Sequence, residues 1–356
     1  MGPQESALVW EQMEMDSVTR DFERLFPAYS FDGKAVLADI MGGQIGEALR
    51  KLCGGISGAV LFQKEEFRML FLSILVLGVA AALFSNFADL FQDHQVSDIA
   101  FYLIYLLLIA VLLKFFVETA DTVKEILNGV VTFVRLYIPT YILAVGGASG
   151  AVSASVYYQL LLVAVYLIEW GYLSVLVPFV YAYVLMTVIN GIWLEEKLAL
   201  LLELSEKVIK GSLKASAWLI TGFSLLQSMI SPVIDSLQSS AVKKALSAMP
   251  GVGGLTEGMF EMVLGSAVLV KNSLGIYMTL TLVALCAVPV LKIALTACVI
   301  KLGAALIGII SDKRLTNCAS RVGEGNLMLL RIALTSVGMF MIQVAIISYS
   351  AGQAVR

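Results

Sequence analysis

The hydrophobic pattern changes character near residue 66, where mixed polar sequence gives way to long apolar runs. About 20 helical residues cross the hydrocarbon core of a bilayer, and most of these runs reach or approach that length. The pattern therefore predicts an all-α fold, a polytopic transmembrane helical bundle with about seven to nine membrane segments. The predicted segments are residues 69–88, 99–117, 130–148, 151–168, 172–192, 215–231, 255–272, 274–310 and 327–350.

Two stretches are too long for one span, and both contain residues that interrupt helices. The stretch 151–192 contains Glu169, Gly171 and Pro178, and we expect two segments that meet near Glu169. The stretch 274–310 contains Pro289, which lacks a backbone donor and clashes with the carbonyl four residues earlier. The bundle is therefore expected to contain broken or re-entrant helices.

Two segments have an amphipathic pattern, which predicts helices at the membrane interface. The N-terminal region, residues 1–66, is expected to form amphipathic helices on the membrane surface or on a partner, with breaks at Gly42-Gly43 and Gly54-Gly55. Glu195 to Lys214 should form an interfacial helix rather than a span, because it carries acid-to-base pairs at i, i+4.

The remaining chain divides into three predicted units. Residues 67–128 hold the first two transmembrane helices, and residues 129–250 and 251–356 form two helical membrane units. The last two units match under a shift of 111 residues, which places Val177-Pro178 on Val288-Pro289. A duplication and a coincidence among the seven prolines are both open explanations.

Composition excludes several classes of protein. Hydrophobic residues make up 59% of the chain and charged residues 14%, against about 25% charged in ordinary domains. This excludes a soluble globular enzyme, and the bilayer is the expected surrounding. The net charge of −3 does not indicate the basic surface that is typical of proteins that bind nucleic acids. With four scattered Cys, one His and no nucleophile–base pair, we expect no metal, no cofactor and no enzymatic activity.

Ionisable groups at membrane depth are the first candidates for function, because they are costly there. Glu169 could line a water-filled path or bind a cation; alternatively, its surroundings form an interfacial loop in which Trp170 and Tyr172 belong to an aromatic belt. Lys292 and Lys301 are nine residues apart and cannot share one helix face. One would face the interior and the other would reach toward the surface.

The small residues around Gly146, Gly147 and Ser149 provide another candidate. They permit either a re-entrant, pore-lining turn or close helix packing without a role in transport.

Four stretches resemble the stage III sporulation protein AE family of endospore-forming bacteria. They are Gly146-Gly147 leading to Val152-Ser153-Ala154, Lys197-Leu198 with Leu201-Leu202 and Ala217-Trp218, Leu269 to Ile276 with Lys271-Asn272, and Val288 to Leu306 with Pro289, Lys292 and Lys301. With the helix-break residues, these motifs define the candidate pore or break positions: Gly146, Gly147, Ser149, Glu169, Gly171, Pro178, Lys271, Asn272, Pro289, Lys292 and Lys301.

The resemblance implies a multi-pass protein of the mother-cell membrane surrounding the forespore. It would be the gate or platform of a secretion-like channel complex required for endospore development, alongside an ATPase, ring-forming proteins and small membrane subunits. A homo-oligomer is also compatible. Members of the family usually begin with a signal peptide, and residues 1–20 contain no apolar region of that kind. The alternative is a stand-alone secondary transporter with its substrate site at the broken helices.

Overall fold

The structure is a computed structural model, and it describes residues 33–52, 64–91, 94–149, 163–192, 198–222, 253–310 and 313–353. Within these ranges the chain is helical apart from short turns, and no strand occurs in them. The all-α prediction is therefore confirmed. The predicted helix over Ser6 to Phe26 and the break at Gly54-Gly55 fall outside the described residues.

The N-terminal part begins with a short helix–turn–helix. Helix α3 (Gly33–Met41) is followed by a turn and by helical residues 45–52. Gly43 takes a positive φ of 78°, a conformation that glycine adopts without strain, so the predicted break at Gly42-Gly43 is confirmed. The ammonium of Lys51 lies 2.5 Å from the carboxylate of Asp39 and ties the two helices together. Helix α3 packs against α10 (Gly253–Ile310).

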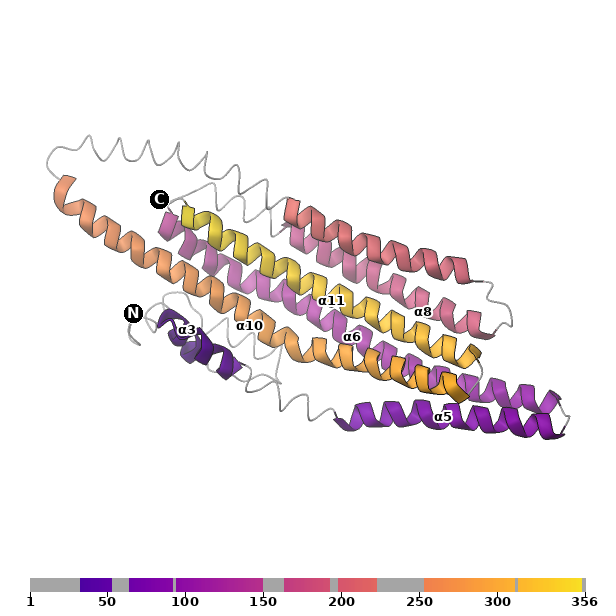
Figure 1. Cartoon of the computed structure of the whole chain (residues 1–356). Helices are drawn as coiled ribbons and strands as arrows, with labels where there is room; N and C mark the ends of the chain where they lie inside the picture. Colours follow the sequence, from indigo (N-terminus) through magenta and orange to yellow (C-terminus); the bar gives the residue numbers. More distant parts are fainter. Residues whose placement is uncertain are drawn as a thin grey trace.

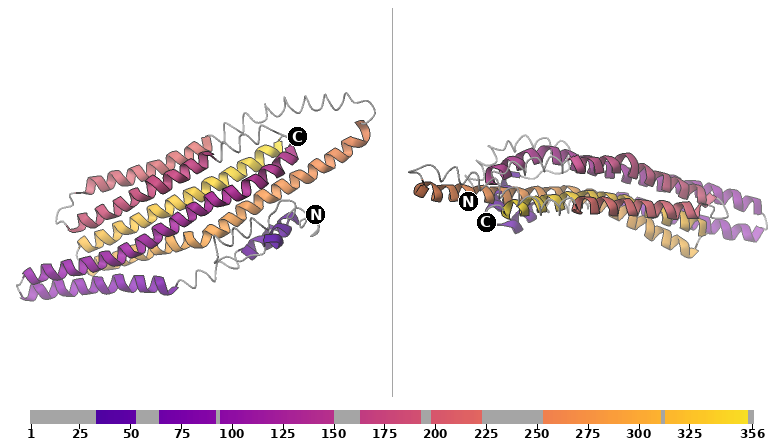
Figure 2. Two further views of the ribbon diagram at one scale, coloured as in Figure 1. Left: turned by 180° about the vertical axis from the view of Figure 1, so that it is seen from behind. Right: turned by 90° about the horizontal axis from the view of Figure 1, so that it is seen from above.

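The longest helices run side by side. They are α5 (Lys64–Phe91), α6 (His94–Ser149), α10 and α11 (Lys313–Gln353). Helix α10 packs along α5, α6 and α11, so it holds one half of the molecule together. Figure 1 shows that the hairpin of α5 and α6 extends beyond the ends of the other helices. Seen from above, the molecule is long and flattened (Figure 2).

Residues 163–192 form a second, outer layer together with helical residues 199–222. Residues 163–171 continue through a π-helical turn, η1 (Tyr172–Leu176), into α8 (Val177–Ile192), which packs on α11. Helix 199–222 then runs back along them. The backbone N–H of Leu198 donates to the side-chain oxygen of Asn190 at 2.9 Å, and the hydroxyls of Tyr172 and Ser216 share a hydrogen bond at the other end.

Helix 199–222 packs lengthwise on the bundle, and its placement at the membrane interface stays a prediction. Its buried face consists of Leu202, Ser205, Ile209, Leu213, Ser216 and Ile220. Of the apolar face expected from the sequence, Leu202 and Ile209 are buried, whereas Leu201 and Val208 are exposed. The expected i, i+4 ion pair between Glu203 and Lys207 forms at 2.8 Å, and the pair between Glu206 and Lys210 also forms.

The core is filled by aromatic rings and by side chains that enter glycine notches. Phe133 of α6 meets Phe340 of α11 edge to face, with ring centroids 5.5 Å apart. At the contact of α5 with α10, Ile74 lies over Gly303 and Ile307 lies over Gly78. A Cβ at Gly303 would lie 2.8 Å from a methyl carbon of Ile74, so these glycines allow the helices to approach closely.

Several predicted spans join into single long helices. Segments 99–117 and 130–148 belong to α6, which has 56 residues and runs unbroken through positions 128 and 129. Segments 255–272 and 274–310 belong to α10, which has 58 residues and accommodates Pro289 within it. The described residues hold five helices that are long and apolar enough to cross a membrane. They are Glu65–Leu83, Phe101–Arg135, Val163–Ile192, Ser273–Ile309 and Lys313–Ile342. The 111-residue repeat stays a prediction.

Candidate functional site

A carboxyl group lies buried between the outer layer and α11. Glu169 is 0% exposed, and its Oε1 accepts a hydrogen bond of 2.6 Å from the hydroxyl of Ser336 on α11. Among the residues that the structure describes, no donor lies within hydrogen-bonding reach of Oε2. Buried polar atoms are normally paired, so this oxygen marks a position where a proton, a water molecule or a cation would be accommodated.

The backbone beside Glu169 departs from a regular α-helix. In η1 the N–H of Val177 donates to the carbonyl of Tyr172, five residues earlier. Pro178 follows directly, and its ring excludes the normal hydrogen bond to the carbonyl four residues before it. The wider π-turn is one way to accommodate such a residue, and single π-turns are frequent at functional sites.

Tyr172 extends the polar cluster toward helix 199–222. It is buried, its hydroxyl shares a hydrogen bond with the hydroxyl of Ser216, and it lies 4.0 Å from the sulfur of Met339. The Ser216 hydroxyl also donates to the carbonyl of Leu213 at 2.9 Å. Glu169, Tyr172, Ser216 and Ser336 therefore form a buried polar cluster contributed by three helical segments.

The interfacial-loop interpretation of Glu169 is wrong. The residue lies in a continuous helix and is buried, because the π-turn lets the helix continue where a break into two segments was expected. Trp170 is 58% exposed, but Tyr172 points inward and belongs to no exposed aromatic belt. Gly171 is half-buried and Pro178 is exposed, and their contribution to a pore stays a prediction.

A second polar feature crosses the bundle near its middle, and we call it the charged belt. At its centre, Glu324 of α11 pairs with Lys301 of α10 at 2.6 Å and with Arg331 at 3.6 Å. Lys292 of α10 pairs with Glu66 of α5 at 3.2 Å. The belt consists of Glu65, Glu66 and Arg68 on α5, Lys114, Glu118, Asp121, Lys124 and Glu125 on α6, Glu203, Glu206, Lys207, Lys210 and Lys214 on helix 199–222, Lys292 and Lys301 on α10, and Arg321, Glu324 and Arg331 on α11.

Contacts between helices bring several of these charges close together. Glu66, Glu118 and Lys292 line one small pocket with Thr119 and Thr296. The ammonium of Lys124 lies 5.4 Å from the ring centroid of Tyr181 on α8. On helix 199–222, the ammonium of Lys207 lowers the pKa of the exposed Glu203 carboxyl through a hydrogen bond, and Glu203 raises the pKa of Lys207.

The lysines predicted as functional residues belong to this belt. Lys292 faces α5 and Lys301 faces α11, so the nine-residue spacing does place them on different faces of α10. Each has an acidic partner, whereas the sequence suggested one interior lysine and one surface lysine. The aliphatic stem of Lys301 lies over Gly323, where a Cβ would stand 2.8 Å from its Cγ. The structure brings neither lysine into the cluster around Glu169.

The other predicted positions lie within long helices. Gly146, Gly147 and Ser149 belong to the last turns of α6, which is helical to Ser149, and residues 150–162 lie outside the described residues. Lys271 and Asn272 lie inside α10, as does Pro289. Their contribution to a pore stays a prediction.

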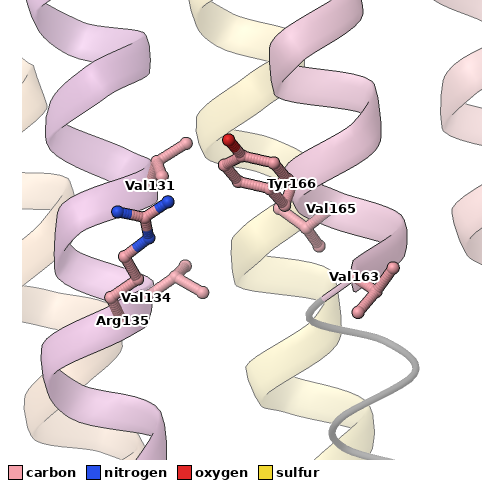
Figure 3. Close-up of a pocket in the computed structure, with 6 residues that line it drawn as sticks. All are labelled: Val131, Val134, Arg135, Val163, Val165 and Tyr166. Atoms are coloured by element: carbon pink, nitrogen blue, oxygen red, sulfur yellow. The ribbon is translucent and has the colours of Figure 1, made fainter.

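A further pocket of about 200 Å³ opens between α6 and residues 163–166. Figure 3 shows Arg135 and Val131 of α6 opposite Tyr166 and Val165. The guanidinium of Arg135 lies 5.3 Å from the centroid of the Tyr166 ring, a distance typical of a cation–π contact. The pocket is largely apolar, and Glu169 is not among its lining residues.

Sequence reasoning missed the partners that define both features. Ser336, Ser216 and Glu324 are ordinary polar residues in the linear sequence, and only the packing of distant helices gives them a role. Asn326 lies directly before the predicted span 327–350, so its burial was not expected from the sequence. It is 0% exposed, and its side chain donates to the carbonyl of Val322 at 3.0 Å. Within the described residues, His, Cys, Asp and Glu form no group of three that could hold a metal ion.

The similarity of the chain to known proteins extends over most of its length. The family described as Stage III sporulation protein AE matches residues 31–351. Stage III sporulation protein AE of Bacillus subtilis (strain 168) is 20% identical over 278 residues, which cover 78% of this chain and 70% of that protein. No solved structure matches the chain.

Proposed function

The chain belongs to the stage III sporulation protein AE family, and from this premise we propose that it is the gate or platform of a channel complex between mother cell and forespore. Family membership supports a role in sporulation, and the apolar helices make it a multi-pass membrane protein. In the proposal it lies in the mother-cell membrane around the forespore. It acts there without enzymatic activity of its own, beside an ATPase, ring-forming proteins and small membrane subunits of a secretion-like apparatus.

The observation that carries the proposal is the length of the apolar helices. The candidate span Ser273–Ile309 has 37 residues, which rise about 55 Å at 1.5 Å per residue. A bilayer core is about 30 Å thick, and tilts beyond about 40° are outside the usual range. One bilayer therefore covers only part of the apolar surface, and the rest needs protein around it. This favours a subunit of an assembly over a protein that works alone.

The test combines a clean deletion with isolation of the complex. We expect the deletion to arrest sporulation after engulfment, and we expect the tagged full-length protein, extracted in mild detergent from sporulating cells, to recover ATPase and ring-forming subunits. The matched control is the same extraction from vegetative cells that express the tagged protein. Normal spores from the deletion strain would refute the proposal. If the tagged protein purifies without any of these subunits, the proposal that it is part of this complex is refuted.

A stand-alone transporter is the second candidate, and the buried Glu169 favours it. A carboxyl group with an unpaired oxygen, beside a π-turn in a membrane helix, is the arrangement from which a coupled ion or proton site can be built. That candidate predicts ion-coupled uptake by the purified protein in proteoliposomes. Equal uptake by the wild type and by Glu169→Ala would show that Glu169 takes no part in transport. The variant Lys292→Ala tests the charged belt in the same way.

A further inference from the structure

The buried carboxyl group of Glu169 lies in a part of the outer layer that is held less firmly than the rest. Residues 163–171 precede the π-turn η1, and α8 follows it. A pocket of about 200 Å³ lies between residues 163–166 and α6, with the Tyr166 ring and the Arg135 guanidinium on its two sides (Figure 3). The start of the outer layer therefore packs incompletely on its neighbour.

The part of the outer layer beyond the π-turn is anchored at two glycines. A Cβ at Gly325 of α11 would lie 2.5 Å from a methyl carbon of Val184, so α8 fits closely against α11 at this point. Tyr105 of α6 occupies the space beside Gly191. Helix α8 is thus fixed on two sides, whereas the π-turn separates it from residues 163–171.

The surroundings of Glu169 favour the neutral form of its carboxyl group. The ionised form has two oxygens that accept hydrogen bonds and no group that donates one. Ser336 donates to Oε1 at 2.6 Å, and no donor among the described residues reaches Oε2. The side chain is 0% exposed, and an isolated charge in such a place is far more costly than a neutral group. A proton on Oε2 removes the charge and lets this oxygen do without a donor.

Within the part of the chain that the structure describes, no cation pairs with this carboxyl group. The titratable and charged groups that adjoin it are Tyr172 on its own helix, Cys286 on α10, Arg135 on α6, Arg331 on α11 and Lys214 on helix 199–222. The first two are never cationic. Arg135 lies over an aromatic ring, Arg331 pairs with a glutamate of the charged belt, and Lys214 is exposed. A proton is therefore the simplest source of neutrality.

Ionisation of Glu169 is coupled to the position of residues 163–171. An ionised carboxylate requires hydration, and the buried side chain obtains water only if this segment separates from α11. The hydrogen bond with Ser336 is a polar link between the two elements at this position. Loss of the proton therefore favours separation, and binding of the proton favours contact, because the two equilibria are linked reciprocally.

We propose that Glu169 is a proton-binding site that controls the contact of residues 163–171 with α11. With a proton on Oε2 the segment lies on α11; without the proton it turns outward about η1, while α8 keeps its place. Tyr172 lies at this hinge and bonds to Ser216, so helix 199–222 would move with the segment. The inference goes beyond the proposed function, because it assigns a ligand and a moving part to a site that the gate proposal does not use.

Two buried valines on either side of η1 can report the movement. Val165 is 2% exposed and lies one turn before Glu169, and Val184 is 0% exposed in the anchored part. In purified full-length protein with the four native cysteines replaced by alanine, Val165→Cys and Val184→Cys are each treated with a maleimide over a series of pH values. Thiols react faster as pH rises because the thiolate is the nucleophile. Each rate is therefore divided by the rate in the matching Glu169→Gln protein, whose side chain has no proton to release.

The corrected rate at Val165→Cys should rise with pH by up to about tenfold per pH unit, because each opening releases one proton. The corrected rate at Val184→Cys should stay constant, which also shows that the protein remains folded. A constant corrected rate at Val165→Cys, or an equal rise at both positions, would overturn the proposal. Glu169→Met also lacks a titratable group, and it takes the place of Glu169→Gln if that variant does not keep Val184→Cys protected.

Infrared spectroscopy identifies the ligand independently. A protonated carboxyl group has a C=O stretch that is separate from the amide bands, and the wild type should show such a band that is missing in Glu169→Gln. Raising the pH should remove the band in step with the labelling of Val165→Cys. Addition of sodium chloride at constant pH, with choline chloride as the matched salt, should leave the band unchanged. Identical spectra of the wild type and Glu169→Gln, or loss of the band with sodium alone, would overturn the assignment of a proton.

Discussion

Replacing Glu169 by methionine should make the protein more stable and, if the carboxyl group serves the assembly, less active. The side chain is fully buried, has one hydrogen bond to Ser336, and leaves Oε2 without a described partner. An unpaired buried polar atom costs about 1–3 kcal/mol. Methionine has a similar length and no polar oxygen, so Glu169→Met should recover an energy of that order. The hydroxyl of Ser336 can turn to its own helix backbone.

The opposite sign is expected for Ser336→Ala. That change removes the hydroxyl that donates to the carboxyl group and should lower the free energy of unfolding by about 1–3 kcal/mol. In the double variant, Glu169→Met with Ser336→Ala, the serine should no longer matter. The cycle of four proteins therefore isolates the interaction of the two side chains.

Buried thiols provide the assay. Cys286 and Cys318 are buried and Cys298 is exposed, so a background with Cys53→Ala and Cys298→Ala leaves two thiols that react with a maleimide dye only after unfolding. On heating in detergent, Glu169→Met should raise the midpoint by roughly 2–6 °C and Ser336→Ala should lower it by a similar amount. The reasoning is refuted if Glu169→Met lowers the midpoint. A stabilised Glu169→Met that supports normal sporulation would show that the carboxyl group has no role in function.

Two further predictions concern packing and the charged belt. Glu324→Gln should destabilise the folded protein by about 1–3 kcal/mol because it leaves Lys301 and Arg331 without their shared carboxylate; the thiol assay measures this, and Glu324→Leu with Lys301→Met should recover most of the loss. Gly303→Ala should cost about 1–3 kcal/mol because its Cβ meets Ile74 at 2.8 Å. Adding Ile74→Ala to Gly303→Ala should relieve part of that cost, and fully additive losses would contradict the proposed contact.

The sequence predicts the helical character of this protein well, because apolar runs without turn signals have few alternatives in a membrane. It predicts the ends of helices poorly. Residues 118–129 separate two predicted spans and end in Asn128-Gly129, a pair that favours turns. Helix α6 nevertheless continues through them. Local turn signals did not decide where this helix ends, because it is held by packing against α10 and α11.

The sequence also predicts the candidate site only in part. Gly171 and Pro178 correctly located an irregular backbone beside Glu169, but local sequence does not distinguish a broken helix from a π-turn. That choice depends on long-range packing, here on Ser336 of α11 and on Ser216 of helix 199–222. Neither serine carries a pattern that would identify it as a partner. The same holds for Glu324, whose partner Lys301 comes from another helix.

The positions of regular and irregular backbone divide the bundle into a stiff part and an adaptable part. Helix α6 lacks Gly and Pro across the charged belt, and the reciprocal notches of Gly78 and Gly303 hold α5 firmly on α10. On the other side, the π-turn weakens the regular hydrogen bonding of the outer layer next to the polar cluster around Glu169. A conformational change should therefore involve the outer layer and α11, with the α5–α6 hairpin as a fixed frame. Helix 199–222 is joined to residues 163–192 by the hydrogen bond between Tyr172 and Ser216, so a change at Glu169 would also move this helix.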